Sequence, residues 1–282
     1  MPQTGRKRDH LRRTIFEHPE YRDILSLFQS LFAYIEGKED ATGIAFALPD
    51  GRGAKRVSSG LPLLSPKNLS VERESAASFL SGILDVMRGA SRDPSGKEEL
   101  ERIGRAIEAK SLNLSGLFGA CLSRESKVLE EAAAAIPVSA PLLTFVLEVP
   151  LKTALSLAAE SVEPGSVAGW TEGRCPVCGS RPGMDELAEE EGKRYLCCSS
   201  CAFHWPFPRI KCPHCGNQDP ETLSCFSAGD GPTRVSVCRK CRRYIKTRDS
   251  RKGNAGVPLD AEDLSTLHLD LLAAKEGFER GK

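Results

Sequence analysis

The sequence lacks the features by which enzymes are usually recognised. Its 282 residues hold two tryptophans and three methionines, with no phosphate-binding loop, nucleophile–base signature or paired-carboxylate motif. The formal net charge is only +1, so no global electrostatic attraction draws the chain to nucleic acid or to a membrane surface. No window reaches the roughly 18 uninterrupted apolar residues of a membrane span. We therefore expect neither an enzyme nor an integral membrane protein.

The cysteines are concentrated in one part of the sequence. Ten of the eleven cysteines lie between residues 175 and 241. Eight of them form Cys-x-x-Cys pairs, a spacing that lets two thiolates from one tight turn reach the same tetrahedral metal ion. The loops between successive pairs, 19 and 22 residues long, predict two sequential Cys₄ sites. The first comprises Cys175, Cys178, Cys198 and Cys201; the second comprises Cys212, Cys215, Cys238 and Cys241. Zinc and iron both suit four tetrahedral sulfurs, so we expect two ions, Fe or Zn.

The position after each pair supports a repeated unit. Gly179 and Gly216 follow the first and third pairs, where glycine allows the positive φ that a metal-binding turn often requires. Ala202 and Arg242 follow the second and fourth pairs. Each predicted site thus joins one pair followed by glycine to one without it.

The clustering of the cysteines also bears on the compartment. Metal-bound thiolates are typical of a reducing environment, whereas disulfide scaffolds belong to secreted chains. Arg12 and Arg13 resemble a twin-arginine export signal, but polar residues follow where such a signal needs an apolar stretch. We expect a cytoplasmic protein.

Apolar spacing predicts an α plus small-β fold. We expect an all-α domain over 1–165, a first Cys₄ ribbon over 170–208, a second over 209–255 and a C-terminal helix over 256–282. That last helix should pack on the α-domain through Leu264, Leu267, Leu271 and Leu272. Residues 1–10 are expected to form a loose tail. Predicted helices cover 24–35, 74–89, 100–107, 114–122, 128–136 and 141–159, the last broken or kinked at Pro150. Predicted strands cover 194–196, 207–210, 233–237 and 244–247, and 185–191 should be a solvated loop.

The cysteine-rich segment is basic, with fifteen Lys and Arg against ten Asp and Glu over residues 170–252. Each Cys₄ site with a divalent ion carries a formal charge of −2, so these cations can simply compensate the thiolates. The alternative is a face that binds phosphate or a protein. For that alternative the candidate contacts are Arg239, Lys240, Arg242 and Arg243.

The other sulfur and imidazole side chains have weaker claims to bind metal. Cys197 adjoins a predicted ligand but has the wrong spacing for the turn. Cys121 and Cys225 are expected to be buried thiols, and His204 and His214 are possible substitutes for a thiolate. Trp170 and Trp205 should cover the metal-binding turns with apolar surface.

Several segments together resemble the formate dehydrogenase accessory (formation) proteins of bacteria, of the FdhE type. They are 173–182, 194–201, Trp205, 209–216, 238–246 and 259–272. His204, where the family usually has a carboxylate, and Cys197 depart from the family pattern. The resemblance implies a non-catalytic cytoplasmic protein that binds the catalytic subunit of a formate dehydrogenase and assists its maturation. It also implies rubredoxin-like iron as an alternative to zinc.

Two other functions remain open from the residues alone. Zinc ribbons commonly bind nucleic acid, and the basic run 239–252 would serve that role, although the near-zero net charge argues against it. A rubredoxin-like redox protein is the third hypothesis. Thiol–disulfide catalysis is disfavoured because redox Cys-x-x-Cys pairs usually occur singly at a helix start in a βαβ fold.

Overall fold

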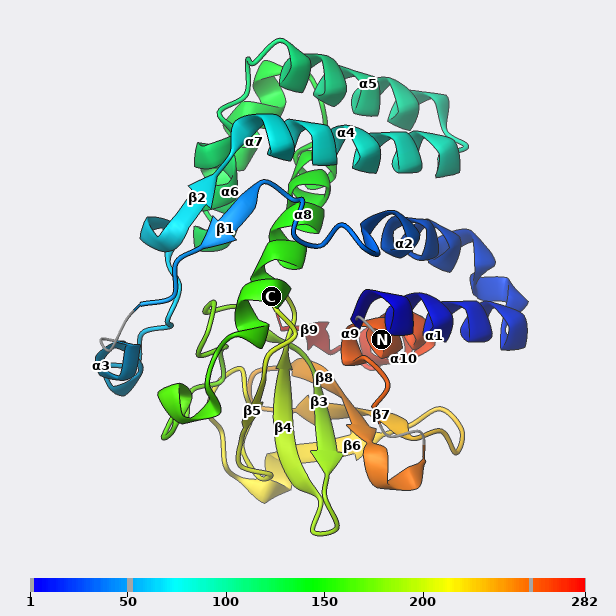
Figure 1. Ribbon diagram of the computed structural model, residues 1–282. Helices are drawn as coiled ribbons and strands as arrows, with labels where there is room; N and C mark the ends of the chain where they lie inside the picture. The colour runs from blue at the N-terminus through cyan, green and yellow to red at the C-terminus, as the bar shows by residue number, and fades with distance from the viewer. Residues whose placement is uncertain (1–2, 50–52, 254–255, 282) are drawn as a thin grey trace.

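The protein consists of a helical part stacked on a mainly antiparallel sheet (Figure 1). The computed structural model describes residues 3–49, 53–253 and 256–281. The predicted boundary at residue 255 and the two chain ends lie outside these ranges. The fold is therefore of the predicted mixed class, with helices first, cysteine-rich strands next and helices again near the C-terminus.

Capped amphipathic helices build the upper part. Glu72 accepts hydrogen bonds from the backbone N–H groups of Glu74 and Ser75 at the start of one helix, and Asp93 and Ser139 cap two others. Their apolar faces meet in one core. The helices are α1 (Gln3–Glu17), α2 (Arg22–Ile35), α3 (Gly53–Ser58), α4 (Arg73–Ala90), α5 (Pro94–Glu108), α6 (Leu114–Ser123), α7 (Ser126–Ala135) and α8 (Ala140–Glu160).

Three features of this part differ from expectation. Helix α1 occupies the segment expected to be a loose tail, because its buried Leu11 contacts α2 and a C-terminal helix. The region is also not wholly helical, since β1 (Ile44–Phe46) and β2 (Leu69–Val71) pair antiparallel. Pro150 does not break α8, whose 21 residues are long and apolar enough to cross a membrane. Such a helix is also typical of a protein core, and Leu143, Leu151 and Leu155 are buried in the helical core here.

The lower part is a seven-stranded sheet made from two similar units. The order of its six main strands is β5-β4-β3-β8-β7-β6, and β9 (Glu279–Arg280) pairs with β8. Each unit contributes three antiparallel strands, and a parallel pairing between β3 and β8 joins the units into one sheet. The strands are β3 (Pro182–Ala188), β4 (Lys193–Cys198), β5 (His204–Pro206), β6 (Leu223–Phe226), β7 (Thr233–Cys238) and β8 (Arg243–Asp249).

Strand β3 replaces much of the segment that the sequence predicted as a solvated acidic loop. Its Asp185 is 0% exposed and forms an ion pair with the buried Arg194 of β4. The pattern of charges along the sequence does not reveal this ion pair. The predicted strand at 207–210 is likewise wrong, because β5 ends at Pro206.

The C-terminal segment folds as two short helices rather than one. Helix α9 (Leu259–Ser265) packs on α1, while α10 (Leu267–Lys275) places Leu269 and Ala273 against the β7 residues Val235 and Val237. The predicted apolar stripe is therefore only partly buried, and Leu271 is 74% exposed. The segment thus bridges the first helix and the second cysteine-rich unit.

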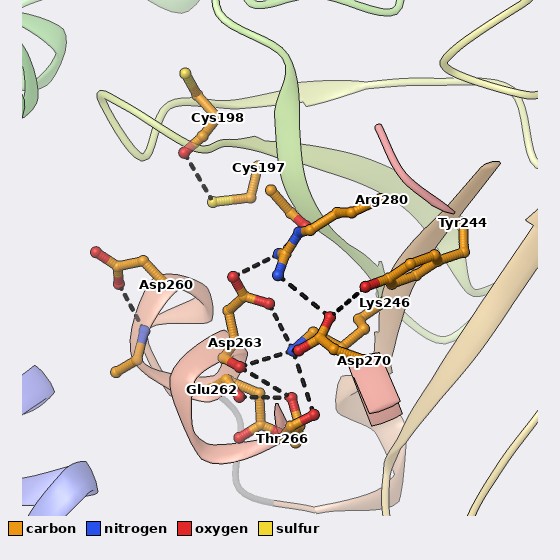
Figure 2. Close-up of polar contacts among 12 residues, drawn as sticks. Cys197, Cys198, Tyr244, Lys246, Asp260, Glu262, Asp263, Thr266, Asp270 and Arg280 are labelled. Atoms are coloured by element: carbon orange, nitrogen blue, oxygen red, sulfur yellow. Dashed lines mark hydrogen bonds and ion pairs between the residues drawn. The ribbon is translucent and has the colours of Figure 1, made fainter. Parts of the chain in front are cut away.

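A buried charge network fastens these helices to the sheet. The ammonium of Lys246, which is 0% exposed, lies 2.7 Å from carboxylate oxygens of both Asp263 and Asp270. Figure 2 shows the Arg280 guanidinium beside the same two carboxylates, and Tyr244 donates a hydrogen bond to Asp270 at 2.7 Å. Because every charge has an opposite partner, burial is tolerated and the geometry is strongly specified.

Glu262 extends this fastening to α1. It pairs with Arg248 of β8 at 2.8 Å, accepts a hydrogen bond from Thr233 of β7 and lies 3.3 Å from the imidazole of His10. Burial alone would raise the pKa of Glu262, but His10, Thr233 and the charge of Arg248 lower this pKa to about 2. The ionised carboxylate therefore holds three elements together.

Replacing Glu262 by glutamine should make the stability less dependent on pH. Because the folded pKa of about 2 lies below the ordinary 4.5, the carboxylate stabilises fully above pH 4.5 and loses its effect as pH falls toward 2. The shift corresponds to about 3 kcal/mol. Denaturant unfolding of both proteins from pH 3 to pH 7 should show a difference in stability that shrinks below pH 4.5. A constant difference would contradict this assignment.

Candidate metal centres

The first cluster brings together Cys175, Cys178, Cys198 and Cys201. Their sulfur atoms all lie within 4.8 Å of one another, and all four residues are buried. The shortest separations are 3.4 Å between Cys178 and Cys198 and 3.5 Å between Cys175 and Cys201. These distances are far from the 2.05 Å of a disulfide bond, and all four cysteines are free thiols.

The second cluster contains Cys212, Cys215, Cys238 and Cys241, again within 4.8 Å. Sulfur–sulfur distances are 3.7 Å for Cys212 with Cys241 and for Cys215 with Cys238. Cys215 is exposed and Cys241 partly exposed, unlike any member of the first cluster. The pairs that the sequence combines in series are thus the pairs that the structure groups.

The donor geometry fits a tetrahedral divalent ion. Four sulfurs at about 2.3 Å from a central zinc ion stand about 3.8 Å apart, close to the separations observed. Backbone N–H groups point at the sulfurs, as metal-binding turns require. In the first cluster Val177 donates to Cys175 and Ser200 to Cys198, and in the second cluster His214 donates to Cys212, each at 3.4 Å.

The thiols need a cation to become four thiolates. Burial raises the pKa values of Cys175 and Cys201 well above the ordinary thiol range, while hydrogen bonds from Cys175 and Cys198 lower that of Cys178. In the second cluster burial raises the pKa of Cys241 to about 11. A bound divalent ion would supply the missing positive charge, and binding would release protons.

All four turns share one backbone conformation. The residue after the second cysteine has a positive φ in each: 74° at Gly179 and Gly216, 54° at Ala202 and 56° at Arg242. Glycine therefore marked only two of the four turns that have this positive φ. Ala202 and Arg242 adopt the left-handed region at a cost of about 1 kcal/mol each, which the surrounding turn must offset.

The two clusters differ in their surroundings. The first belongs to the core of the helical part, and the backbone N–H groups of Leu63 and Leu64 donate to the carbonyls of Pro176 and Val177. Trp205 is 1% exposed in the same core, and Trp170 is 6% exposed. Around the second cluster, Asn217 donates to the sulfur of Cys238 at 3.6 Å, and solvent reaches Cys215.

The remaining sulfur and imidazole groups lie outside both clusters. Cys197 is buried beside Met184 and Leu259, and burial raises its pKa. Burial also raises the pKa of Cys121 to about 12, in line with a packing role. Cys225 is exposed, so the expectation of a buried thiol there is wrong.

Neither histidine replaces a sulfur in either group of four. His204 is exposed, with its ring 3.8 Å from Glu186. A ring nitrogen of His214 lies 3.2 Å from the carbonyl oxygen of Tyr244. Both imidazoles therefore contact groups other than the clustered sulfurs.

The structure separates the four candidate partner-binding cations. Arg239 and Lys240 are exposed at the tip of the last turn, between Cys238 and Cys241. Arg242 instead donates to the carbonyl oxygens of Glu276 and Gly277 and lies 4.4 Å from the ring centre of Phe278. Arg243 is partly buried in a cavity wall.

Two protein-family models match the cysteine-rich C-terminal part of the chain. The model described as "FdhE, central domain" covers residues 174–209, and "FdhE, C-terminal domain" covers residues 210–282. They meet between the two clusters, so each contains one set of four cysteines.

Similar proteins extend the match over the helical part. A "Protein FdhE homolog" from Aquifex aeolicus (strain VF5) is 29% identical over 265 residues, which cover 92% of this chain and 87% of that protein. Another from Pseudomonas putida is 37% identical over 136 residues, 45% of this chain and 41% of that protein. The crystal structure of the FdhE protein from Pseudomonas aeruginosa has a TM-score of 0.67 at 26% identity, with 98% of this chain and 92% of that chain covered.

The metal content should respond to single cysteine replacements. We expect about two ions per chain, falling by about one in Cys175→Ser or in Cys238→Ser, because each change leaves three sulfurs in one cluster and four in the other. Elemental analysis of anaerobically purified protein measures this. A Cys121→Ser control, which touches neither cluster, should retain both ions; loss of both ions from Cys238→Ser would sink the idea of independent sites.

Exposure of Cys215 predicts unequal release of the two ions. A chelator should remove metal in two phases, the faster from the second cluster, because the first has no exposed sulfur. Time-resolved metal release checks this, and Cys238→Ser should lack the fast phase. Persistence of the fast phase in that variant would reverse the assignment.

Proposed function

We propose, because the chain belongs to the FdhE family and carries two four-cysteine clusters, that it is a metal-containing accessory factor. In this proposal it binds the catalytic subunit of a formate dehydrogenase in the cytoplasm and assists the maturation of that subunit. The observation that carries the proposal is the coincidence of the FdhE match over residues 174–282 with both clusters. The eight cysteines of the two clusters would hold two ions, Fe or Zn.

The metal would act as a structural cross-link. Each ion would tie two turns from the ends of a strand hairpin, and the rigid turns would present exposed side chains at fixed positions. Iron and zinc give different absorption spectra with the same four sulfurs, so a spectrum combined with elemental analysis distinguishes them.

A second cavity lies beside the first cluster. This cavity of about 440 Å³ lies between α1, α2, α8 and the turn after β4. Three of the carboxylates that line it already have partners: Asp260 pairs with Lys7, Glu148 with Lys152, and Asp263 with Lys246.

The proposed partner surface centres on the exposed tip of the last turn. Arg239 and Lys240 project there beside the exposed Cys215. Arg242 and Arg243 were candidates for the same surface, but their internal contacts and cavity position make them poorer ones. Exposed cations at an interface rim chiefly raise the association rate and make it sensitive to salt.

Replacing Arg239 and Lys240 together by serine should weaken binding to a formate dehydrogenase catalytic subunit. The expected loss is about threefold to tenfold at low salt and smaller at 0.15 M, because screening weakens such contacts. Surface plasmon resonance with the purified subunit measures the association and dissociation rates. The metal content of the variant should stay unchanged.

A charge-matched control uses Arg92→Ser with Lys127→Ser, two exposed cations of the helical part. This control should bind like the parent protein. Absence of any binding between the parent protein and the subunit would reject the proposed function. Tight, salt-sensitive binding to RNA or DNA in its place would favour the nucleic-acid hypothesis.

A further inference from the structure

The sheet of the second unit has two chemically different faces. Alternate residues of a strand point to opposite sides, so Tyr244, Lys246 and Arg248 of β8 share the face covered by α9 and α10. Arg243, Ile245 and Thr247 belong to the opposite face, where they line a cavity of about 280 Å³. The segment 209–214, which crosses from the first unit to the second, and Pro220 also line this cavity, and Ile245 itself is buried.

Cations dominate the walls of this cavity. Arg234 and Arg243 line it from β7 and β8, and Arg194 lines it from β4. Arg209 and Lys211 belong to the segment that crosses from the first unit to the second. None of the lining residues in the described ranges is an aspartate or a glutamate, so five positive charges share the cavity without a carboxylate in its walls.

Arg243 has a partner of its own, and the other four cations share one carboxylate among the contacts of the described residues. Arg194 pairs with the buried Asp185. Arg209 and Lys211 donate only to the backbone carbonyls of Glu191 and Thr171 among the contacts of the described residues. The Nε of Arg234 is buried and, within that same part of the chain, has no hydrogen-bond partner. A buried guanidinium donor without an acceptor is costly, which points to an acceptor supplied from outside.

Compensation of the metal site does not account for this excess. Cys212 and Cys238 also line the cavity, and a Cys₄ site with a divalent ion carries a formal charge of −2. Arg243 is left out of this balance because it has a partner of its own. For the other four cations, the carboxylate of Asp185 and the charge of the metal site leave about one positive charge unbalanced near the cavity.

We propose that this cavity, hereafter the basic cavity, binds a small molecule that bears a phosphate group. An arginine guanidinium can donate two parallel hydrogen bonds to the oxygens of one phosphate group. Here the arginines would approach the phosphate from the sheet and from the crossing segment. The volume of about 280 Å³ suits a small ligand rather than a polymer. Ile210, Leu223 and Ile245 add apolar wall, which would accommodate an organic group attached to the phosphate.

Calorimetric titration of the metal-loaded full chain tests the proposal. Inorganic phosphate and phenyl phosphate serve as probes for a free oxyanion and for a phosphorylated organic molecule. We expect saturable binding with one site per chain, weaker at higher salt. Phenyl phosphate should bind at least about threefold more tightly if the apolar wall contacts the ring; equal affinity would identify the ligand as a free oxyanion, within the same site.

Variants then locate the site. Arg234→Gln should weaken phenyl phosphate binding about tenfold or more, because it removes a charged hydrogen-bond donor. Arg234→Lys should restore part of the loss. Arg209→Gln changes an exposed residue of the cavity wall, so it should leave the fold intact and weaken binding as well. The matched control is Arg239→Gln, which removes an exposed charge outside the cavity and should bind normally.

Three outcomes would overturn the proposal. One is the absence of binding at millimolar probe with both metals present. Another is an equal loss in Arg239→Gln and Arg234→Gln, which would mean diffuse attraction without a site. The third is tight binding of a glutamate-rich peptide or an oligonucleotide that phenyl phosphate cannot displace. Partner binding by the parent protein is measured separately, so failure of the phosphate site leaves the proposed function standing.

Discussion

The fold depends on one constraint, that four buried cysteine sulfurs converge on one point. In the first cluster all four cysteines lie in the hydrophobic core, where burial opposes thiolate formation. A bound divalent ion would resolve that conflict and would fix two chain turns at once. Strands β3 and β4 run between those turns, and the pairing of β3 with β8 aligns the second unit. The C-terminal helices pack against both the sheet and α1.

The two units use the same local structure in different environments. Each has a hairpin that ends at the first cysteine of its second turn, and each turn closes with a positive φ. The first unit lies beneath the helical part, whereas the second exposes Cys215. The difference arises from what packs on each unit, because the sulfur separations are alike. This packing buries all four cysteines of the first cluster and leaves Cys215 of the second exposed.

The sequence predicted local patterns well and long-range partners poorly. Cysteine spacing indicated how the sulfurs group, and apolar periodicity located α2 and α4 through α8 within a few residues. It missed β3, because Asp185 looks solvent-facing until Arg194 is brought beside it. It also missed α1, whose few apolar residues gain their contacts from α9 at the other end of the chain. Domain limits remain predictions, and the structure adds that the first cluster shares its core with the helices.

The basic run near the C-terminus shows why charge counts alone could not separate compensation from recognition. Strand alternation sends Lys246 and Arg248 to the helix-covered face, where carboxylates of α9 and α10 neutralise them. The same alternation places Arg243 on the basic cavity, and the preceding turn leaves Arg239 and Lys240 in solvent. One stretch of like charge therefore contains three populations with different energetics. Internal ion pairs stabilise the fold, whereas the exposed tip keeps its charge in contact with solvent.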